Sequence, residues 1–471
     1  MAYELKEECG VFGVYGDPDA VTDTYWGIFS LQHRGQESAG IAAVDDQGQL
    51  VVRKGMGLVT EVLNPILGEL PRAQLAIGHV RYSTSGESEV FNAQPLVMRT
   101  RFGQIALAHN GNVVNAETLR RPLEAEGAVF QGTSDSEILA HLIARSAANN
   151  LSQALVEAVA KLTGGFAFVI LNADAVYGVR DPNGIRPLVV GETEFGEGHV
   201  LASETCALDA VQAKFVREVE PGELVELGPS GVRRLTSVRG AAVSQCAFES
   251  VYFARADSQI RGESAQMARR RMGRVLAQEA PAAADVVIGV PDSSLPHAMG
   301  YAEASHLPFD FGLVKNRYVG RTFIMPRQSE RTRSVQLKLA AVQEVVRGKR
   351  VALVDDSLVR GTNSRYLIQL LRACGATEVH VRIASPPYTD PCYYGIDTSR
   401  ATELAARTKS VEEIRQMIGA DSLAYLSLDG LRQGLKGGGG WCLACFGGGY
   451  PVPPILEPVA YTGVEDGHDR R

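Results

Sequence analysis

The sequence has no uninterrupted apolar run long enough to span a membrane, and its first residues form neither a basic segment nor a long apolar one. A membrane-spanning helix needs about 20 apolar residues, and a secretory signal needs both of those segments. We therefore expect no membrane partner and a cytoplasmic protein.

Positive charge is also in short supply. The chain has 47 Lys and Arg against 54 Asp and Glu, a formal net charge of -7. Proteins that bind the phosphate backbone of nucleic acids usually carry a basic surface. We expect no nucleic-acid partner, and we interpret any basic cluster as a local site.

The cysteines do not form a disulfide pattern. There are seven of them, an odd number, in a chain that lacks a secretion signal. Such a set favours catalytic or metal-binding use over a disulfide framework. The length of 471 residues, without tandem repeats, predicts two or three domains.

The first half of the chain alternates short apolar segments with turns. Ser134 and Glu137 form a capping signal before a helical pattern over 135–149. This mixture predicts an α+β domain with stacked β-layers. Its expected strands cover 9–15, 40–44, 74–80, 105–109, 166–171 and 188–191.

From about residue 265 the pattern changes to alternating helices and strands. This alternation is typical of an α/β domain whose parallel sheet is connected by crossover helices. The expected helices cover 266–278, 294–305 and 363–374, and the expected strands cover 285–290, 351–354 and 378–383.

The strongest motif, over residues 351–362, reads VALVDDSLVRGT. An apolar strand delivers Asp355 and Asp356 to its carboxyl end, where α/β folds bind ligands. The small residues that follow expose backbone N–H groups at a helix start, which suits phosphate. Carboxylates at this place suit ribose hydroxyls or Mg²⁺. The alternative is that both carboxylates only cap the strand and the helix.

This motif resembles the phosphoribosyl pyrophosphate (PRPP) loop of type I phosphoribosyltransferases. The resemblance implies that Mg²⁺ is held through Asp355, Asp356 and Ser293. Ser293 follows a second strand end, at 290–294, where we expect diphosphate contacts. The implied PRPP-binding residues are Asp355, Asp356, Ser357, Arg360, Gly361, Thr362, Lys315 and Arg321.

Lys315 and Arg321 belong to a basic segment that continues to Arg333. In an acidic protein, a basic segment between two phosphate-type strand ends indicates a mobile flap over a polyanion. The alternative is a solvated loop.

Cys9 stands at the start of an apolar, glycine-spaced segment. Alone it is more often a small buried hydrophobe than a catalyst. A thiol here could, however, become the first residue of a shortened chain, with its own α-amine in reach as a base. Four polar turn segments downstream strengthen that interpretation; they cover 33–40, 78–84, 109–112 and 133–136.

Together these segments resemble the class II glutamine amidotransferases, which have an N-terminal nucleophile (Ntn) fold. The resemblance implies that Cys9 forms a γ-glutamyl thioester and that residues 1–8 are a propeptide, removed to free the Cys9 amine. Asn110 and Gly111 are the implied oxyanion hole. Arg81, Thr84 and Asp135 are the implied glutamine-binding residues.

Cys442 and Cys445 form a CxxC pair in a glycine-rich segment. With Cys246 and Cys392 they provide four thiolates, which spacing alone assigns to neither zinc nor an iron–sulfur cluster. Two ordinary buried thiols are the alternative. The order of the two domains is similar to that of the glutamine PRPP amidotransferase family, and resemblance to its iron–sulfur branch implies a [4Fe–4S] cluster on these four cysteines.

We therefore expect a propeptide at 1–8, a glutaminase domain at 9–240, a phosphoribosyltransferase domain at 241–435 and a cluster-binding segment with a tail at 436–471. The implied reaction passes ammonia from glutamine to PRPP and gives 5-phosphoribosylamine, which opens purine biosynthesis. Feedback inhibition by purine nucleotides and a homotetramer follow only from the resemblance. The alternatives are another class II amidotransferase or an iron–sulfur regulatory protein that senses PRPP or purines.

Overall fold

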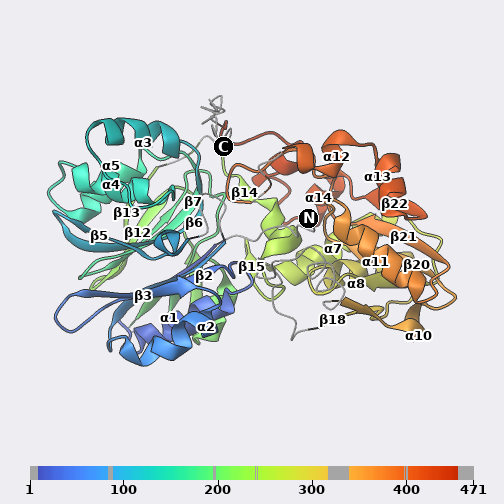
Figure 1. The fold of residues 1–471 in the computed structure, drawn as a ribbon, viewed down its shortest axis with the longest axis horizontal. Helices are drawn as coiled ribbons and strands as arrows, with labels where there is room; N and C mark the ends of the chain where they lie inside the picture. Colours follow the sequence, from blue (N-terminus) through green and yellow to red (C-terminus); the bar gives the residue numbers. More distant parts are fainter. Residues whose placement is uncertain are drawn as a thin grey trace, which may run out of the picture.

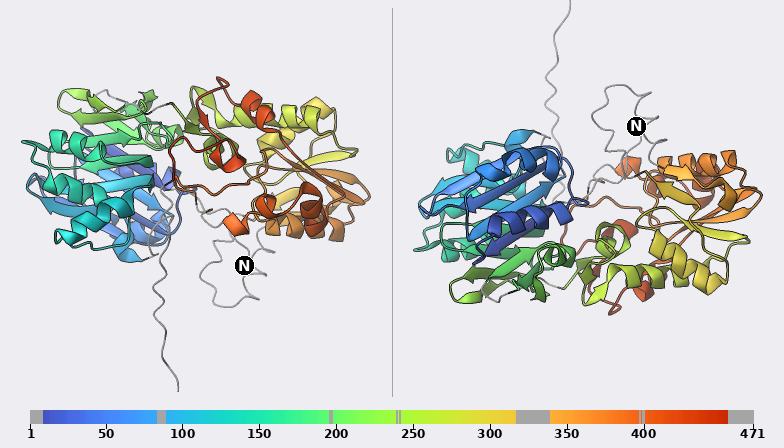
Figure 2. Two further views of the ribbon diagram at one scale, coloured as in Figure 1. Left: turned by 90° about the horizontal axis from the view of Figure 1, so that it is seen from above. Right: turned by 90° about the horizontal axis from the view of Figure 1, so that it is seen from below.

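The computed structural model describes residues 9–82, 89–194, 198–238, 240, 242–316, 339–396, 398 and 401–454. Figures 1 and 2 show two lobes side by side, one formed by the first half of the chain and one by the second. No helix in these ranges is both long enough and apolar enough to cross a membrane.

The first lobe contains two antiparallel sheets. One has the strand order β11-β9-β10-β1-β4-β2-β3 and the other the order β13-β12-β8-β7-β6-β5. The strands of the first sheet are β1 (Gly10–Tyr15), β2 (Ser38–Val44), β3 (Leu50–Met56), β4 (Leu75–Arg81), β9 (Val189–Glu192), β10 (His199–Ala202) and β11 (Lys214–Glu218). Those of the second are β5 (Leu96–Thr100), β6 (Gly103–Val113), β7 (Gly164–Leu171), β8 (Val176–Arg180), β12 (Glu223–Gly228) and β13 (Gly231–Ser237).

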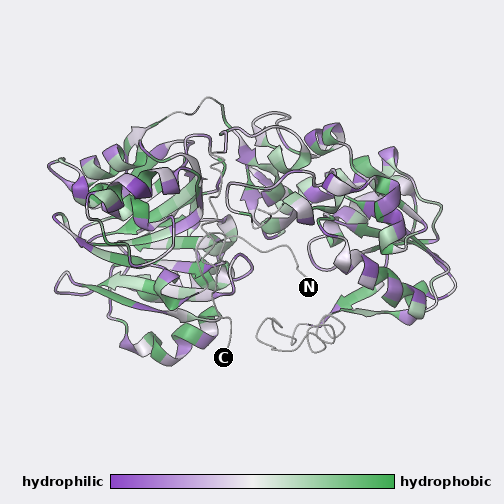
Figure 3. Ribbon diagram, turned by 45° about the horizontal axis from the view of Figure 1, so that its top comes forward, coloured by the Kyte–Doolittle hydropathy of each residue, from purple (hydrophilic) through white to green (hydrophobic). Residues whose placement is uncertain are grey.

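The two sheets pack face to face and are covered by helices on their outer faces. Alternation along a strand sends neighbouring side chains to opposite faces, so Val11 joins the core between the sheets while Phe12 and Val14 join the core under the helices. Figure 3 shows the apolar residues concentrated along these strands. The covering helices are α1 (Ala20–Ser30), α2 (Val59–Leu63) and α6 (Thr205–Ala210) on one side, and α3 (Ala116–Ala125), α4 (Glu137–Arg145) and α5 (Leu151–Val159) on the other.

The second lobe is built on a parallel sheet in the order β17-β20-β21-β22. Its strands are β17 (Val286–Gly289), β20 (Arg350–Asp355), β21 (Glu378–Ile383) and β22 (Ser422–Tyr425). Both faces are covered by helices, as a parallel sheet requires. One face packs against α7 (Ala265–Glu279), α8 (Leu295–Ser305) and α14 (Leu428–Gly434), and the other against α11 (Thr362–Ala373) and α13 (Val411–Ile418).

Short elements complete this lobe. The most important pair for the site is the parallel ladder between β14 (Gln245–Cys246) and β23 (Trp441–Cys442). The remaining strands and helices are β15 (Gln259–Ile260), β16 (Glu263–Ser264), β18 (Leu313–Lys315), β19 (Leu339–Ala341), α10 (Gln343–Val346), α12 (Ala405–Thr408) and the irregular turn η3 (Glu249–Phe253).

The predicted fold classes are confirmed, an α+β lobe of stacked sheets followed by a parallel α/β lobe. The capping signal is wrong. Helix α4 begins at Glu137 after Ser136, whose side chain makes no capping bond. The Glu137 carboxylate instead accepts from the backbone N–H groups of Gln131 and Gly132 at 2.7 and 2.9 Å. Glu137, which was expected to cap the helix, therefore fixes the loop at Gln131 and Gly132.

Candidate active sites

Cys9 immediately precedes β1 and lies at the end of the antiparallel pair β1–β4. The next residue, Gly10, pairs with Val80, so the sheet places Cys9 beside Arg81 and Tyr82. The Cys9 Sγ donates to the Tyr82 carbonyl oxygen at 3.4 Å. A side chain on Gly10 would lie 2.9 Å from Val80, which explains why the residue after the thiol has none.

The Cys9 thiol is 8% exposed. Burial raises its pKa to about 11, and the Tyr82 bond and the Arg81 charge only partly oppose that rise. The thiolate is therefore rare at neutral pH, so nucleophilic attack by Cys9 needs a base. The expected base, the α-amine of Cys9, has an ordinary pKa of about 7.7–8.0, well placed for this task.

Asn110 and Gly111 lie near the end of β6, in the second sheet. Asn110 is fully buried, and its side-chain amide N and O have no hydrogen-bond partner among the described residues. Such unpaired buried groups are costly, so stability does not explain why the Asn110 amide is held in this way, and Asn110 stays a candidate donor. Gly111 has φ 127°, and a Cβ on it would lie 2.1 Å from the Gly165 carbonyl oxygen.

Asp135 and Arg81 are both buried near Cys9, at 8% and 3% exposure. Both contribute charge effects at the Cys9 thiol. The Asp135 carboxylate accepts from the Val113 backbone N–H at 2.8 Å, which fixes it beside the end of β6. The structure thus brings Cys9, Arg81 and Asp135 together. Thr84 lies outside the described residues.

Beneath this site, His79 is fully buried and its Nε2 lies 2.9 Å from the His109 carbonyl oxygen. Burial lowers the pKa of His79 to about 3, and the Arg81 charge acts in the same direction. In the unfolded chain the pKa of a histidine is about 6.5. The free energy of unfolding that neutral His79 contributes is therefore complete above pH 6.5 and is lost as the pH falls towards 3.

We expect the His79→Gln variant to lose less stability on acidification than the parent protein. Between pH 7 and pH 4 the histidine should account for up to about 3 kcal/mol of the parent's loss. Thermal unfolding of both proteins across this range measures the difference. Unfolding temperatures that fall in parallel would contradict a neutral buried His79.

In the second lobe, Asp355 ends β20 and Asp356 follows it, so both lie at the carboxyl end of the parallel sheet. Serines from the start of α8 contact them: Ser293 Oγ donates to Asp356 at 2.6 Å and Ser294 Oγ lies 3.0 Å from an oxygen of each carboxylate. Burial raises the pKa of Asp355, and the Asp356 charge raises it further. Two adjacent carboxylates, one buried and the other half-buried, fit a hard divalent cation.

The loop after this pair is shaped for an anion. Ser357 Oγ donates to Asp356 at 2.7 Å. Gly361, with φ 80°, precedes α11, whose first residue is Thr362. Free N–H groups at a helix start are a general anion site.

The basic side chains around this loop are paired. Arg360 makes a two-nitrogen contact with Glu403 at 2.9 and 2.5 Å. Lys315 lies 3.2 Å from the Asp292 carboxylate. Arg321 lies outside the described residues.

The four cysteines Cys246, Cys392, Cys442 and Cys445 meet at the junction of the second lobe with its last segment. Cys246 and Cys442 are direct partners in the ladder β14–β23. Burial and the neighbouring three thiols raise the pKa of Cys445 well above its usual range. Among the residues that the structure describes, no three His, Cys, Asp or Glu side chains are arranged to hold a metal ion.

These cysteines lie in the apolar core of the lobe. The rings of Phe248, Tyr388 and Phe446 belong to the same core, with centroids 5.7 to 6.0 Å apart. An apolar shell of this kind restricts solvent access to whatever the thiols hold.

Sequence reasoning missed several residues at the site. Arg34, in the quoted segment 33–40, donates from Nε to the Cys9 carbonyl oxygen at 3.0 Å. Glu204 and Glu249 hold that arginine from two other parts of the chain. Of these three residues, only Arg34 could have been predicted from the sequence, because it is a charged residue next to a glycine in a predicted turn.

Comparison with known proteins agrees with this geometry. Residues 79–210 match a family described as a glutamine amidotransferase domain. An amidophosphoribosyltransferase of Bacillus subtilis is 51% identical over 463 residues, 97% of this chain and 96% of the relative. One from Synechococcus elongatus is 48% identical over 95% of this chain and 92% of the relative.

Two solved structures have the same fold at a TM-score of 0.89 and 49% identity. One is the Bacillus subtilis glutamine PRPP amidotransferase in complex with ADP and GMP, matched over 96% of this chain and 99% of that one. The other is described as the allosteric regulatory enzyme of purine biosynthesis, matched over 95% and 97%.

Proposed function

This chain belongs to the amidophosphoribosyltransferase family, and we propose that Cys9 and the pair Asp355–Asp356 are the centres of its two half-reactions. The enzyme transfers the ammonia of glutamine to PRPP and gives 5-phosphoribosylamine, pyrophosphate and glutamate. This is the first committed step of purine biosynthesis. The observation that carries the residue assignment is a buried thiol at the start of β1, facing Arg81 and Asp135.

In the first half-reaction the Cys9 sulfur attacks the side-chain amide carbon of glutamine. The Cys9 α-amine takes the thiol proton and then gives a proton to the departing ammonia. Asn110 and the Gly111 N–H stabilise the charge on the amide oxygen. Arg81 and Thr84 bind the glutamine α-carboxylate and Asp135 its α-ammonium. Water then releases glutamate from the thioester.

An N-terminal amine at Cys9 requires that residues 1–8 be removed, because an amide nitrogen cannot accept the thiol proton. The raised pKa of the Cys9 thiol supports this requirement. Without a base within reach, a thiol with a pKa of about 11 would be almost inert at neutral pH.

In the second half-reaction ammonia attacks the anomeric carbon of PRPP and pyrophosphate leaves. Asp355 and Asp356 would hold Mg²⁺, with Ser293 beside them, and the cation would neutralise charge on the diphosphate when bound. The N–H groups of the loop that ends at Thr362 bind phosphate. Lys315, Arg321 and Arg360 complete the PRPP contacts, and Arg360 would exchange Glu403 for the substrate.

Cys246, Cys392, Cys442 and Cys445 are the proposed ligands of a [4Fe–4S] cluster. The donor set supports it, since four thiols in an apolar shell, three of them buried and that of Cys392 partly buried, match what such clusters require. Each ligand of a cluster binds a different iron, so the thiols need not converge on one point. The cluster would fasten the last segment of the chain to the second lobe.

Intact-mass measurement of anaerobically purified protein tests both proposals. Under denaturing conditions we expect a chain that begins at Cys9, and under native conditions an added mass of four irons and four sulfides. A chain that keeps Met1 or Ala2 while turning over glutamine would overturn the α-amine mechanism. One zinc per chain would overturn the cluster and leave the catalysis standing.

The relatives suggest the remaining partners. Because a relative binds ADP and GMP, purine nucleotides are the proposed feedback inhibitors. A homotetramer, which only the family resemblance implies, is the proposed assembly. None of the seven cysteines forms a disulfide, which fits the reducing cytoplasm as the proposed location.

A further inference from the structure

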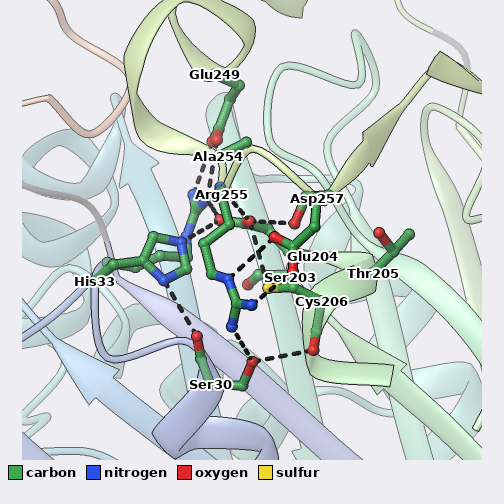
Figure 4. Close-up of polar contacts among 12 residues, drawn as sticks. Ser30, His33, Ser203, Glu204, Thr205, Cys206, Glu249, Ala254, Arg255 and Asp257 are labelled. Atoms are coloured by element: carbon green, nitrogen blue, oxygen red, sulfur yellow. Dashed lines mark hydrogen bonds and ion pairs between the residues drawn. The ribbon is translucent and has the colours of Figure 1, made fainter. Parts of the chain in front are cut away.

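A fully buried cluster of charged side chains lies between Cys9 and the second lobe. Its centre is Arg34, which is 1% exposed. Its carboxylates are Glu204, from the first lobe, and Glu249, from the turn η3 that follows β14. Figure 4 shows Glu249 above His33 and Glu204, on a separate stretch of chain.

Each of the three nitrogens of the Arg34 guanidinium donates a hydrogen bond. Nε donates to the Cys9 carbonyl oxygen at 3.0 Å. Nη1 and Nη2 donate to the two oxygens of Glu249 at 2.9 and 2.7 Å, and Nη1 also contacts Glu204 at 2.5 Å. A planar guanidinium held by a two-pronged carboxylate has one orientation. The position of Glu249 therefore determines where the Cys9 carbonyl is held.

Glu204 is itself fixed on three sides. It accepts from His33 Nε2 at 2.8 Å, from the Ser258 hydroxyl at 2.6 Å and from the Arg255 backbone N–H at 3.0 Å. Although burial alone would raise the pKa of Glu204, the charges of His33 and Arg34 hold it well below its usual range. Glu204 is thus a permanent anion that anchors Arg34 within the first lobe.

The turn η3 is held at its other end by a second buried arginine. Arg269, on α7, donates to the carbonyl oxygens of Ser250 and Tyr252 at 2.9 Å each and of Ala254 at 2.6 Å. One turn of chain is therefore fixed by Arg34 at its first residue and by Arg269 at three carbonyl groups that follow.

Arg269 is 2% exposed and comes from α7, a helix that packs on the parallel sheet of the second lobe. Hydrogen bonds and ion pairs therefore run from α7 through η3 and Glu249 to Arg34 and the Cys9 carbonyl.

Stability alone does not explain such a cluster. Buried ion pairs lose so much hydration that apolar replacements are often as stable or more so. What the cluster provides is a fixed geometry around one peptide group, and that peptide group belongs to Cys9.

We propose that Arg34 is a positioning residue for glutamine hydrolysis and that Glu249 connects it to the phosphoribosyltransferase lobe. The position of that lobe then affects the orientation of the Cys9 peptide group. The inference rests on the proposed role of Cys9 as the nucleophile. Arg34 and Glu249 touch neither substrate, and they act only through the Cys9 peptide.

The test compares Glu249→Gln with Glu223→Gln. Glu223 is an equally buried partner in a two-pronged arginine pair, with Arg217 at 2.7 and 2.9 Å, and that pair belongs to the strands β11 and β12, not to the cluster around Arg34. For Glu249→Gln we expect the glutamine-dependent kcat to fall at least about tenfold while ammonia-dependent synthesis stays within about twofold of the parent. Glu223→Gln should leave the ratio of the two activities unchanged.

Arg34→Lys provides a second variant, because lysine keeps the charge but cannot span Cys9 and both Glu249 oxygens. We expect it to shift the same ratio, and to slow alkylation of Cys9 by an electrophilic glutamine analogue. If either variant lowers both activities in proportion, or neither changes the ratio, the positioning role is wrong. If Cys9→Ala keeps glutamine-dependent synthesis, the proposed function itself fails, and the two failures are thereby distinguished.

Discussion

Replacing Cys9 with alanine is expected to abolish glutamine-dependent synthesis of phosphoribosylamine, by about 10³-fold or more, and to leave ammonia-dependent synthesis within about twofold. The reason is the separation of the two sites. Cys9 lies at the start of β1 in the first lobe, and the carboxylates that serve PRPP lie at the carboxyl end of β20 in the second. Free ammonia needs only the second site.

The measurement is the initial rate of phosphoribosylamine formation with glutamine or with ammonium at alkaline pH as the nitrogen source. Cys374→Ala is the control for loss of a thiol, because Cys374 is assigned no role and follows α11 at the opposite end of the helix from Thr362. We expect Cys374→Ala to keep both activities. Glutamine-dependent turnover by Cys9→Ala would contradict the assignment of the nucleophile, and loss of both activities would show that the lobes do not act separately.

Replacing Asp355 or Asp356 with asparagine is expected to lower synthesis from both nitrogen sources about 10²-fold or more. The two side chains lie beside each other, Asp356 buried and Asp355 half-buried, and loss of hydration raises the pKa of both. Asparagine keeps the shape but removes the negative charge that a divalent cation requires. It also relieves the repulsion within the pair, so we expect the variants to unfold at a higher temperature than the parent.

The matched control is Asp285→Asn. Asp285 also contacts the strands β17 and β20, but at their amino ends, where it makes an exposed two-pronged pair with Arg350 at 2.8 and 3.3 Å. We expect this variant to keep both activities and to show no rise in unfolding temperature. An inactive Asp285→Asn, or an Asp355→Asn that fails only with glutamine, would contradict the placement of the PRPP site.

The parallel lobe was largely predictable from the sequence, because its strands are continuous apolar segments that end in polar motifs. β21 (Glu378–Ile383) has the predicted bounds, and β20 extends the predicted strand by one residue at each end. In the first lobe, α1 was missing from the prediction. Its sequence AVTDTYWGIFS is rich in β-branched and aromatic residues, which are poor helix formers. Val21, Tyr25 and Ile28 stabilise it instead by packing on the first sheet.

The site residues were predictable where they belong to local sequence motifs. They were not predictable where their role depends on a contact with a distant segment of the chain. Asp355 ends an apolar strand and Cys9 precedes one, so the local sequence pattern is enough to predict both as site residues. Glu403 lies beyond the reach of any such pattern, although its carboxylate pairs with Arg360. Glu249 is the clearest case, since an acidic residue in an apolar turn carries no signal until the fold places Arg34 against it.

The pairing of β14 with β23 also bears on how the protein is made. Gln245 and Cys246 are synthesised before the entire parallel sheet, whereas their partners Trp441 and Cys442 come after it. A chain still growing on the ribosome therefore carries an unpaired edge, with a buried-type thiol exposed, until its last segment emerges. Closing so long a loop costs entropy that is recovered only when the final contacts form. The segment that contains Trp441 and Cys442 thus completes the lobe, and a chain that stopped before this segment would leave an open edge prone to aggregation.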